Sequence, residues 1–195
     1  MKPINNYESI QASTDEFARP VPGGYIIVIT GVKDVPLDPV SGKGEYLNIQ
    51  YDFAAGDFKG YHREMSERFG FWGGSFIRSY KEKAVSMFKH FTNCIEESNP
   101  GYKWDFNEVG LIGRYLGIVL GEEEYLSNKD NCIKTRLAVK AIKTPKQIQE
   151  GDFKVPPIKR LDGAPGAAPT VCAVPAAAPQ NAPRWETIND SELPF

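Results

Sequence analysis

The sequence predicts a mainly β domain followed by a tail without regular structure. Three observations support this prediction. Five segments have strand character, one amphipathic segment lies between the third and the fourth of them, and the composition changes abruptly after Leu161. Of the 195 residues, 41% are hydrophobic and 25% are charged, which provides enough apolar surface for one buried core.

The first half of the body is expected to contain three strands. Residues 23–35 are a β-branched run that ends before Pro36. Residues 45–54 alternate apolar and polar side chains, which is typical of a strand with one buried face. After a glycine-containing turn, residues 61–66 are expected to form a shorter third strand.

The second half begins with a helix. Apolar side chains recur every three or four residues through residues 81–97, and the sequence Asn99-Pro100-Gly101 ends the pattern. Two further strands are expected at residues 115–123 and 132–142, joined by a hairpin turn. Residues 143–160 are basic and interrupted by prolines, and we expect them to lie along the strands without adding to the sheet.

The order of three strands, one helix and two strands matches the OB-fold. This fold is a five-stranded Greek-key barrel with its helix between strands three and four, and its exposed sheet face and loops bind oligonucleotides. A four-stranded sheet with a packing helix would give a similar pattern. The expected domains are residues 1–160 as an OB-fold nucleic-acid-binding domain, 161–183 as a disordered linker rich in Ala, Pro and Gly, and 184–195 as an acidic partner-binding tip.

The net charge of -2 is the sum of two segments whose charges have opposite signs. Residues 1–160 have a net charge of +1, and residues 161–195 have a net charge of -3. Within the body, residues 125–160 hold nine basic residues and three acidic ones. The last part of the body is therefore expected to attract phosphate groups.

Most of the candidate nucleic-acid-binding residues come from two regions, and Tyr51, Arg63 and Lys143 lie outside them. In residues 68–80, aromatic side chains alternate with glycines and arginines, a pattern that suits stacking on bases and contact with phosphates. In the fifth strand, a period of two places three cations on one face. The alternatives are that these aromatic side chains seal the barrel and that the basic strand is a solvated surface. The predicted residues are Tyr51, Arg63, Arg68, Phe71, Trp72, Arg78, Lys134, Arg136, Lys140 and Lys143.

The sequence gives little support for catalysis or for a membrane location. It contains no phosphate-binding loop, no nucleophile elbow and no zinc-ligand spacing of histidines and cysteines. We therefore expect no enzyme activity, no metal and no cofactor. No apolar run reaches the length of a membrane span and no signal-peptide segment is found, so we expect the cytoplasm of the cell that makes the chain and no membrane partner.

The sequence ends in Asn189-Asp190-Ser191-Glu192-Leu193-Pro194-Phe195. This segment resembles the C-terminal tip of bacterial single-stranded DNA-binding proteins, in which acidic residues precede a hydrophobic-Pro-Phe end. The resemblance implies that the tip recruits other proteins. The residues that match it are Asp190, Glu192, Leu193, Pro194 and Phe195.

Several short motifs of the body resemble a family of phage and prophage proteins from Gram-positive hosts. These motifs are Gly23-Gly24-Tyr25, Tyr51-Asp52-Phe53, Phe71-Trp72-Gly73-Gly74, residues 77–81 and residues 151–156. Members of that family resemble phage single-strand binders of OB-fold type that are linked to replication and recombination. The resemblance implies an OB-fold and a bacterial host cell.

Taken together, these features predict a non-enzymatic protein that binds and protects single-stranded DNA without strong sequence preference. Its tip is expected to recruit replication, recombination or repair proteins. Two alternatives stay open at this stage. One is a phage adaptor or inhibitor that engages a host enzyme of DNA metabolism through the tip without binding DNA, and the other is a nuclease or other DNA-modifying enzyme built on an OB barrel. Homo-oligomerisation also stays open.

Overall fold

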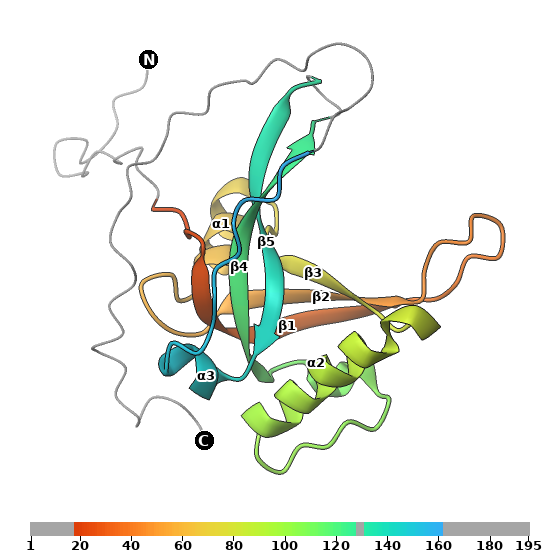
Figure 1. The fold of residues 1–195 in the computed structure, drawn as a ribbon. Coiled ribbons are helices and arrows are strands. Elements are labelled where there is room, and N and C mark those ends of the chain that lie inside the picture. The colour runs from red at the N-terminus through yellow and green to blue at the C-terminus, as the bar shows by residue number, and fades with distance from the viewer. Residues whose placement is uncertain (1–17, 128–130, 162–195) are drawn as a thin grey trace, which may run out of the picture.

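The computed structural model describes residues 18–127 and 131–161. Its main feature is a five-stranded antiparallel sheet in the order β3-β2-β1-β4-β5 (Figure 1). The strands are β1 (Gly23–Val35), β2 (Tyr46–Phe53), β3 (Ser75–Ser79), β4 (Tyr115–Leu126) and β5 (Ile133–Lys143). The helix α2 (Val85–Ser98) follows β3 and precedes β4. The predicted mainly β fold, with five strands and a helix between the third and the fourth, is confirmed.

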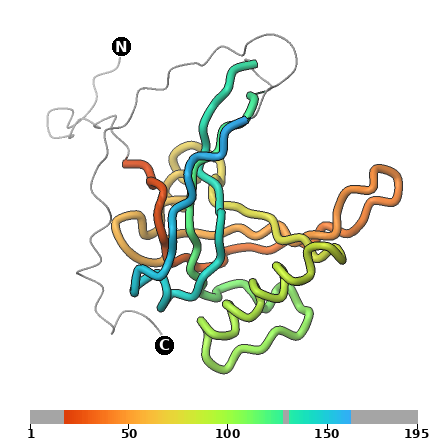
Figure 2. The backbone as a smooth tube through the Cα atoms, viewed as in Figure 1, coloured from red at the N-terminus to blue at the C-terminus, as the bar shows by residue number. Residues whose placement is uncertain are grey.

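The strand order is that of an OB-fold, in which the first strand pairs with both the second and the fourth. In the described residues β3 and β5 are the two edges and no hydrogen bonds join them, so the sheet is open between these strands. Two arms leave the body, the β1–β2 loop and the far half of the β4–β5 hairpin, and they point in different directions (Figures 1 and 2).

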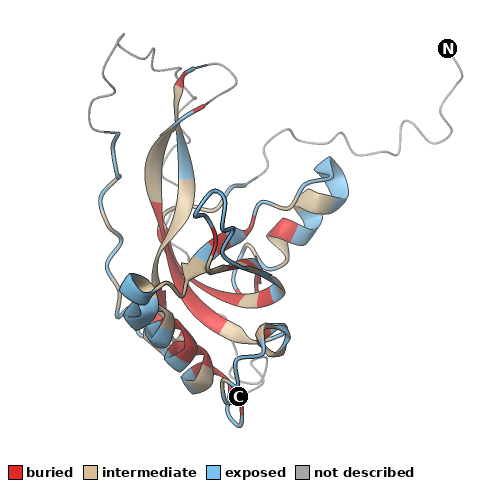
Figure 3. Ribbon diagram, turned by 90° about the vertical axis from the view of Figure 1, so that its right-hand side faces the viewer, coloured by how far each residue is buried: buried red, intermediate tan, exposed pale blue. Residues whose placement is uncertain are grey.

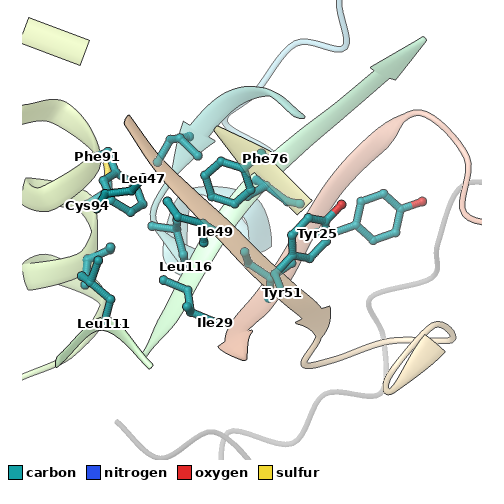
Figure 4. Close-up of a cluster of buried hydrophobic side chains, with 14 of the residues drawn as sticks. Tyr25, Ile29, Leu47, Ile49, Tyr51, Phe76, Phe91, Cys94, Leu111 and Leu116 are labelled. Carbon is teal, nitrogen blue, oxygen red and sulfur yellow. The ribbon is translucent and has the colours of Figure 1, made fainter. Parts of the chain in front are cut away.

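The main core lies inside the curved sheet. Ile27, Ile49 and Leu116 come from three neighbouring strands and are fully buried. Figure 4 shows Phe91 and Cys94 of α2 at one end of this cluster, and Tyr25 and Tyr51 at the other. Burial of each large apolar side chain contributes about 1.5–3 kcal/mol, so this cluster holds the sheet and α2 together.

A second, smaller core lies on the opposite face of the sheet. The helix α3 (Pro145–Gln149) places Ile148 against Ile26 and Val119, and Phe153 packs beside them. A methyl group on Gly24 would lie 2.6 Å from the Phe153 ring, so only glycine leaves room for this contact. Residues 143–160 therefore lie along the sheet as expected, with one isolated bridge between Lys159 and Glu123.

The predicted third strand at residues 61–66 is wrong. These residues belong to the helix α1 (Tyr61–Phe69), and β3 begins later, at Ser75. Gly60 precedes the helix with φ 77° and Gly70 follows it with φ 71°, backbone conformations that glycine adopts without strain. The buried carboxylate of Asp52 accepts the first helical N–H groups, and this contact from a distant strand is not visible in the local pattern.

The other elements lie close to their predicted positions. The bounds of β1 agree with the prediction, and α2 begins at Val85, after a short 3₁₀ turn at Glu82–Ala84. Strand β4 is longer than predicted and continues to Leu126. No helix in the described ranges is both long enough and apolar enough to cross a membrane.

Candidate nucleic-acid interface

An exposed aromatic cluster lies between α1 and β3. Phe69 ends the helix and is 59% exposed, Phe71 is 55% exposed, and Trp72 is half-buried. The left-handed Gly70 turns the chain between the two phenylalanines, and its N–H donates to the carbonyl oxygen of Ser66. We call Phe69, Phe71 and Trp72 the aromatic patch. Solvent-exposed rings of this kind can stack on bases.

Two contacts hold Trp72 in place. Its indole N–H donates to the carbonyl oxygen of Gly74 at 2.9 Å, and the same oxygen accepts the backbone N–H of Tyr51 at 3.0 Å. The indole ring also contacts the ring of His62, with 6.1 Å between the ring centres. Trp72 is therefore attached both to strand β2 and to helix α1.

Helix α1, whose last residue Phe69 begins the aromatic patch, also carries charged side chains. Arg63 is exposed and, within the described part of the chain, its side chain forms no ion pair. Arg68 pairs with Glu64 at 3.1 Å, and both side chains are about half exposed. A pair at this exposure contributes little, so a phosphate group can compete for Arg68. Glu67 is a further exposed acid on this helix.

The predicted basic face of β5 is largely ion-paired. Arg136 and Lys140 both bind the carboxylate of Glu123 on the neighbouring strand β4, at 2.8 and 2.5 Å. Hydrogen bonds from Lys140 and Arg136 lower the pKa of Glu123, so this acid stays charged. Arg136 also lies over the ring of Tyr125 at 5.2 Å. These two cations are therefore partly neutralised by the chain itself.

The remaining cations of β5 differ from one another. Lys143 lies 3.7 Å from the carboxylate of Asp152, and Lys134 is half-buried near the end of the hairpin. The predicted alternation of inward and outward side chains along β5 is interrupted at Lys140. Val119 pairs with Ala141 and Leu120 pairs with Val139, so Lys140 is the extra residue of a β-bulge. Beyond the bulge, Ile142 therefore faces the core and Lys143 faces outward.

Arg78 does not lie on the outer face of the sheet. It is opposite Leu47 in the β2–β3 pair, so it faces the core side, and its guanidinium group lies 4.9 Å from the centre of the Phe76 ring. Burial lowers the pKa of Arg78 to about 10, so it is still a cation at neutral pH. Within the described residues Arg78 forms no ion pair, and its one hydrogen bond goes to the carbonyl oxygen of Ile77.

Tyr51 is a core residue, and its predicted role in stacking on bases is corrected. Its ring packs against Phe53, Phe76 and His62 inside the sheet. The alternation of β2 places Tyr51 on the same face as Leu47 and Ile49, and that face is the buried one. Burial raises the pKa of its hydroxyl group far above the usual range.

The sequence-based prediction omitted residues on the outer face of the sheet. Lys33, Asn48 and Ile77 lie side by side across β1, β2 and β3, and Ile77 is more than half exposed. Strands two and three form the ligand-binding face of many OB-folds. Phe69 was also omitted, although its spacing of two residues from Phe71 was visible in the sequence. Strand register, which only the structure supplies, places the first three residues together.

Figure 3 shows how burial divides the molecule. Buried residues gather where β1, β2 and β4 meet, and the far half of the β4–β5 hairpin is mostly intermediate.

Within the ranges that the structure describes, no group of three His, Cys, Asp or Glu side chains could hold a metal ion. The predicted tip residues Asp190, Glu192, Leu193, Pro194 and Phe195 lie outside the described residues.

No protein-family model matches the sequence, and no curated protein matches it either.

Proposed function

We propose that this protein binds single-stranded DNA without strong sequence preference and that its tip recruits proteins of replication, recombination or repair. The observation that supports the proposal best is the aromatic patch, with exposed Phe69 and Phe71 and half-buried Trp72, which follows the helix that carries Arg63 and Arg68. Such proteins act in the cytoplasm of the bacterial host cell, which is where we place this one.

The chemistry of the patch suits a flexible single strand. Every base has a flat face that can stack on an aromatic ring, and each stacked base contributes about 1–3 kcal/mol. Arg63 has no carboxylate partner in the described residues, and the ion pair of Arg68 with Glu64 is exposed and contributes little. Both cations can therefore pair with the phosphates that flank a stacked base.

A second part of the contact comes from the outer face of the sheet. Lys33 supplies a cation and Ile77 an exposed apolar surface, next to the polar side chain of Asn48. The β5 cations play a smaller role than their number suggests, because Glu123 occupies Arg136 and Lys140. We expect them to contact phosphates only by exchanging this carboxylate for a phosphate group.

The experiment that tests the proposal is the affinity of the full chain for a labelled 30-nucleotide oligo-dT, measured by fluorescence anisotropy. Substituting Trp72→Ala is expected to weaken binding by about 5- to 150-fold, which corresponds to the loss of one stacked base. Phe106→Ala is the matched control, because Phe106 is 86% exposed on the loop after α2, where its ring contacts Trp104 and not the aromatic patch. It is expected to leave the affinity unchanged.

Two results would contradict the proposal. If the full chain does not bind oligo-dT at low salt, the adaptor that engages a host enzyme through the tip becomes the better interpretation. If Phe106→Ala weakens binding as much as Trp72→Ala does, the DNA is not held at the aromatic patch.

A further inference from the structure

We infer that His62 is a positioning residue, which holds Trp72 ready to stack on a base only while its imidazole ring is neutral. Single-stranded DNA binding by the aromatic patch should therefore weaken as the pH falls below neutrality. This inference rests on the proposed function for its DNA-binding part, but the coupling between His62 and Trp72 can be measured without DNA.

His62 lies inside a stack of aromatic rings. It is 8% exposed and stacks on Phe53 with 5.2 Å between the ring centres and 20° between the planes. The ring of Tyr51 meets it edge to face at 5.2 Å. On the outer side the next ring is Trp72. His62 thus connects the buried core to the aromatic patch.

The imidazole ring of His62 packs directly against Gly74. A methyl group on Gly74 would lie 2.6 Å from the Nε2 atom of His62, and Gly73 also lies close to the ring. Gly74 is the same residue whose carbonyl oxygen accepts the indole N–H of Trp72. A displacement of His62 would therefore disturb the position of Trp72 directly.

Protonation of this ring is costly. The Nε2 atom is buried and has no hydrogen-bond partner among the described residues. A neutral imidazole can leave that nitrogen without a proton, but the imidazolium ion carries an N–H on both nitrogens. The buried charge and the unpaired N–H are then both unfavourable.

The groups around His62 only partly offset this cost. Burial lowers the pKa of His62, and the negative charge of Asp52 acts in the opposite direction. Tyr51 on β2 and Tyr61 on α1 also face the ring, and burial raises the pKa of both, so they stay neutral. Arg63, which follows His62 in the chain, is a cation, and the loop residues Trp72 to Gly74 do not titrate.

The sign of the pH effect follows from the lowered pKa. We call the arrangement with His62 buried against Trp72 closed, and one in which His62 reaches water open. The closed arrangement favours neutral His62, so it is stable above the ordinary histidine pKa of about 6.5. As the pH falls below that value, an arrangement in which His62 reaches water gains a proton first and becomes more populated. Trp72 loses its support in that arrangement, and the patch binds bases less well.

The test uses full-length protein in which Trp72 is the only tryptophan, with Trp104→Phe and Trp185→Phe. Between pH 8 and pH 5 its emission maximum is expected to shift to longer wavelength without DNA. The ratio of the closed to the open arrangement is expected to fall by up to tenfold for each unit by which the pKa of His62 differs between them, and the affinity for oligo-dT falls with the closed fraction. Thymine bases do not titrate in this range.

Two variants in this background assign the effect to one residue. His62→Phe keeps a flat ring that cannot be protonated, so both the emission maximum and the affinity should become independent of pH. His90→Gln removes the other of the two histidines, which is exposed on α2, and should behave as the parent. Far-UV circular dichroism at each pH shows whether the fold is kept.

The inference is overturned if the emission of Trp72 does not change between pH 8 and pH 5, or if His62→Phe keeps the full pH dependence. An effect that disappears in His90→Gln instead would also overturn it. If the parent protein fails to bind oligo-dT at pH 8, the proposed function fails, whereas the emission experiment still decides the role of His62.

Discussion

The carboxylate of Asp52 in strand β2 accepts the backbone N–H of His62 at the start of helix α1, with 2.9 Å between Oδ1 and the nitrogen. Asp52 is 1% exposed, and it also accepts the backbone N–H groups of Phe53 and Arg63. The first turn of a helix has unpaired N–H groups and carries partial positive charge, so a carboxylate stabilises it. One buried acid thus fixes both the start of α1 and its position against the sheet.

Removing the charge of Asp52 should therefore destabilise the protein. Asp52→Asn replaces a group that accepts three N–H groups with an amide that has one acceptor and an N–H₂ of its own. We expect the free energy of unfolding to fall by about 1.5–3 kcal/mol, the usual contribution of hydrogen bonds to a charged group. Urea denaturation followed by circular dichroism measures the loss. The exposed Asp57→Asn is the control, and an equal loss in both variants would show that the buried contacts do not matter.

Removing Glu123 should release two cations of β5 for phosphate binding. In Glu123→Gln, Arg136 and Lys140 lose their shared carboxylate. If both then contact phosphates, the plot of log affinity for oligo-dT against log salt concentration becomes steeper by about 1.4. Glu122→Gln makes the same charge change on the opposite face of β4 and should leave the slope as it is. Equal slopes for the parent and both variants would exclude β5 from the interface.

Deleting residues 184–195 should leave binding to oligo-dT intact or make it tighter. The deleted segment carries Glu186, Asp190 and Glu192, whose negative charges compete with phosphate groups for the cations of the body. Anisotropy titrations of the full chain and of the truncated chain measure the difference at low salt. A double variant, Asp190→Asn with Glu192→Gln, separates the charge of the tip from its apolar end. Loss of binding on truncation would mean that the tip itself holds DNA.

The sequence by itself determined most of the sheet and the main helix. The β-branched run of β1, the alternation of β2 and the apolar stripe of α2 are local patterns, because each depends on neighbours within one element. The aromatic segment that contains Phe71 and Trp72 was also visible as a sequence pattern, and so was the acidic tip, since both depend on residue types close together in the chain.

Only the tertiary structure decided which of these side chains are available. Residues 61–66 form a helix because a carboxylate from β2 caps it, and Tyr51 is buried because its face of the sheet meets the core. The bulge at Lys140 shifts the pattern of β5 by one residue, and Glu123 pairs with cations that are distant in sequence. Hydrogen bonds, register and ion pairs between separate elements determine these features, and such contacts leave no periodic trace in the residues of either element alone.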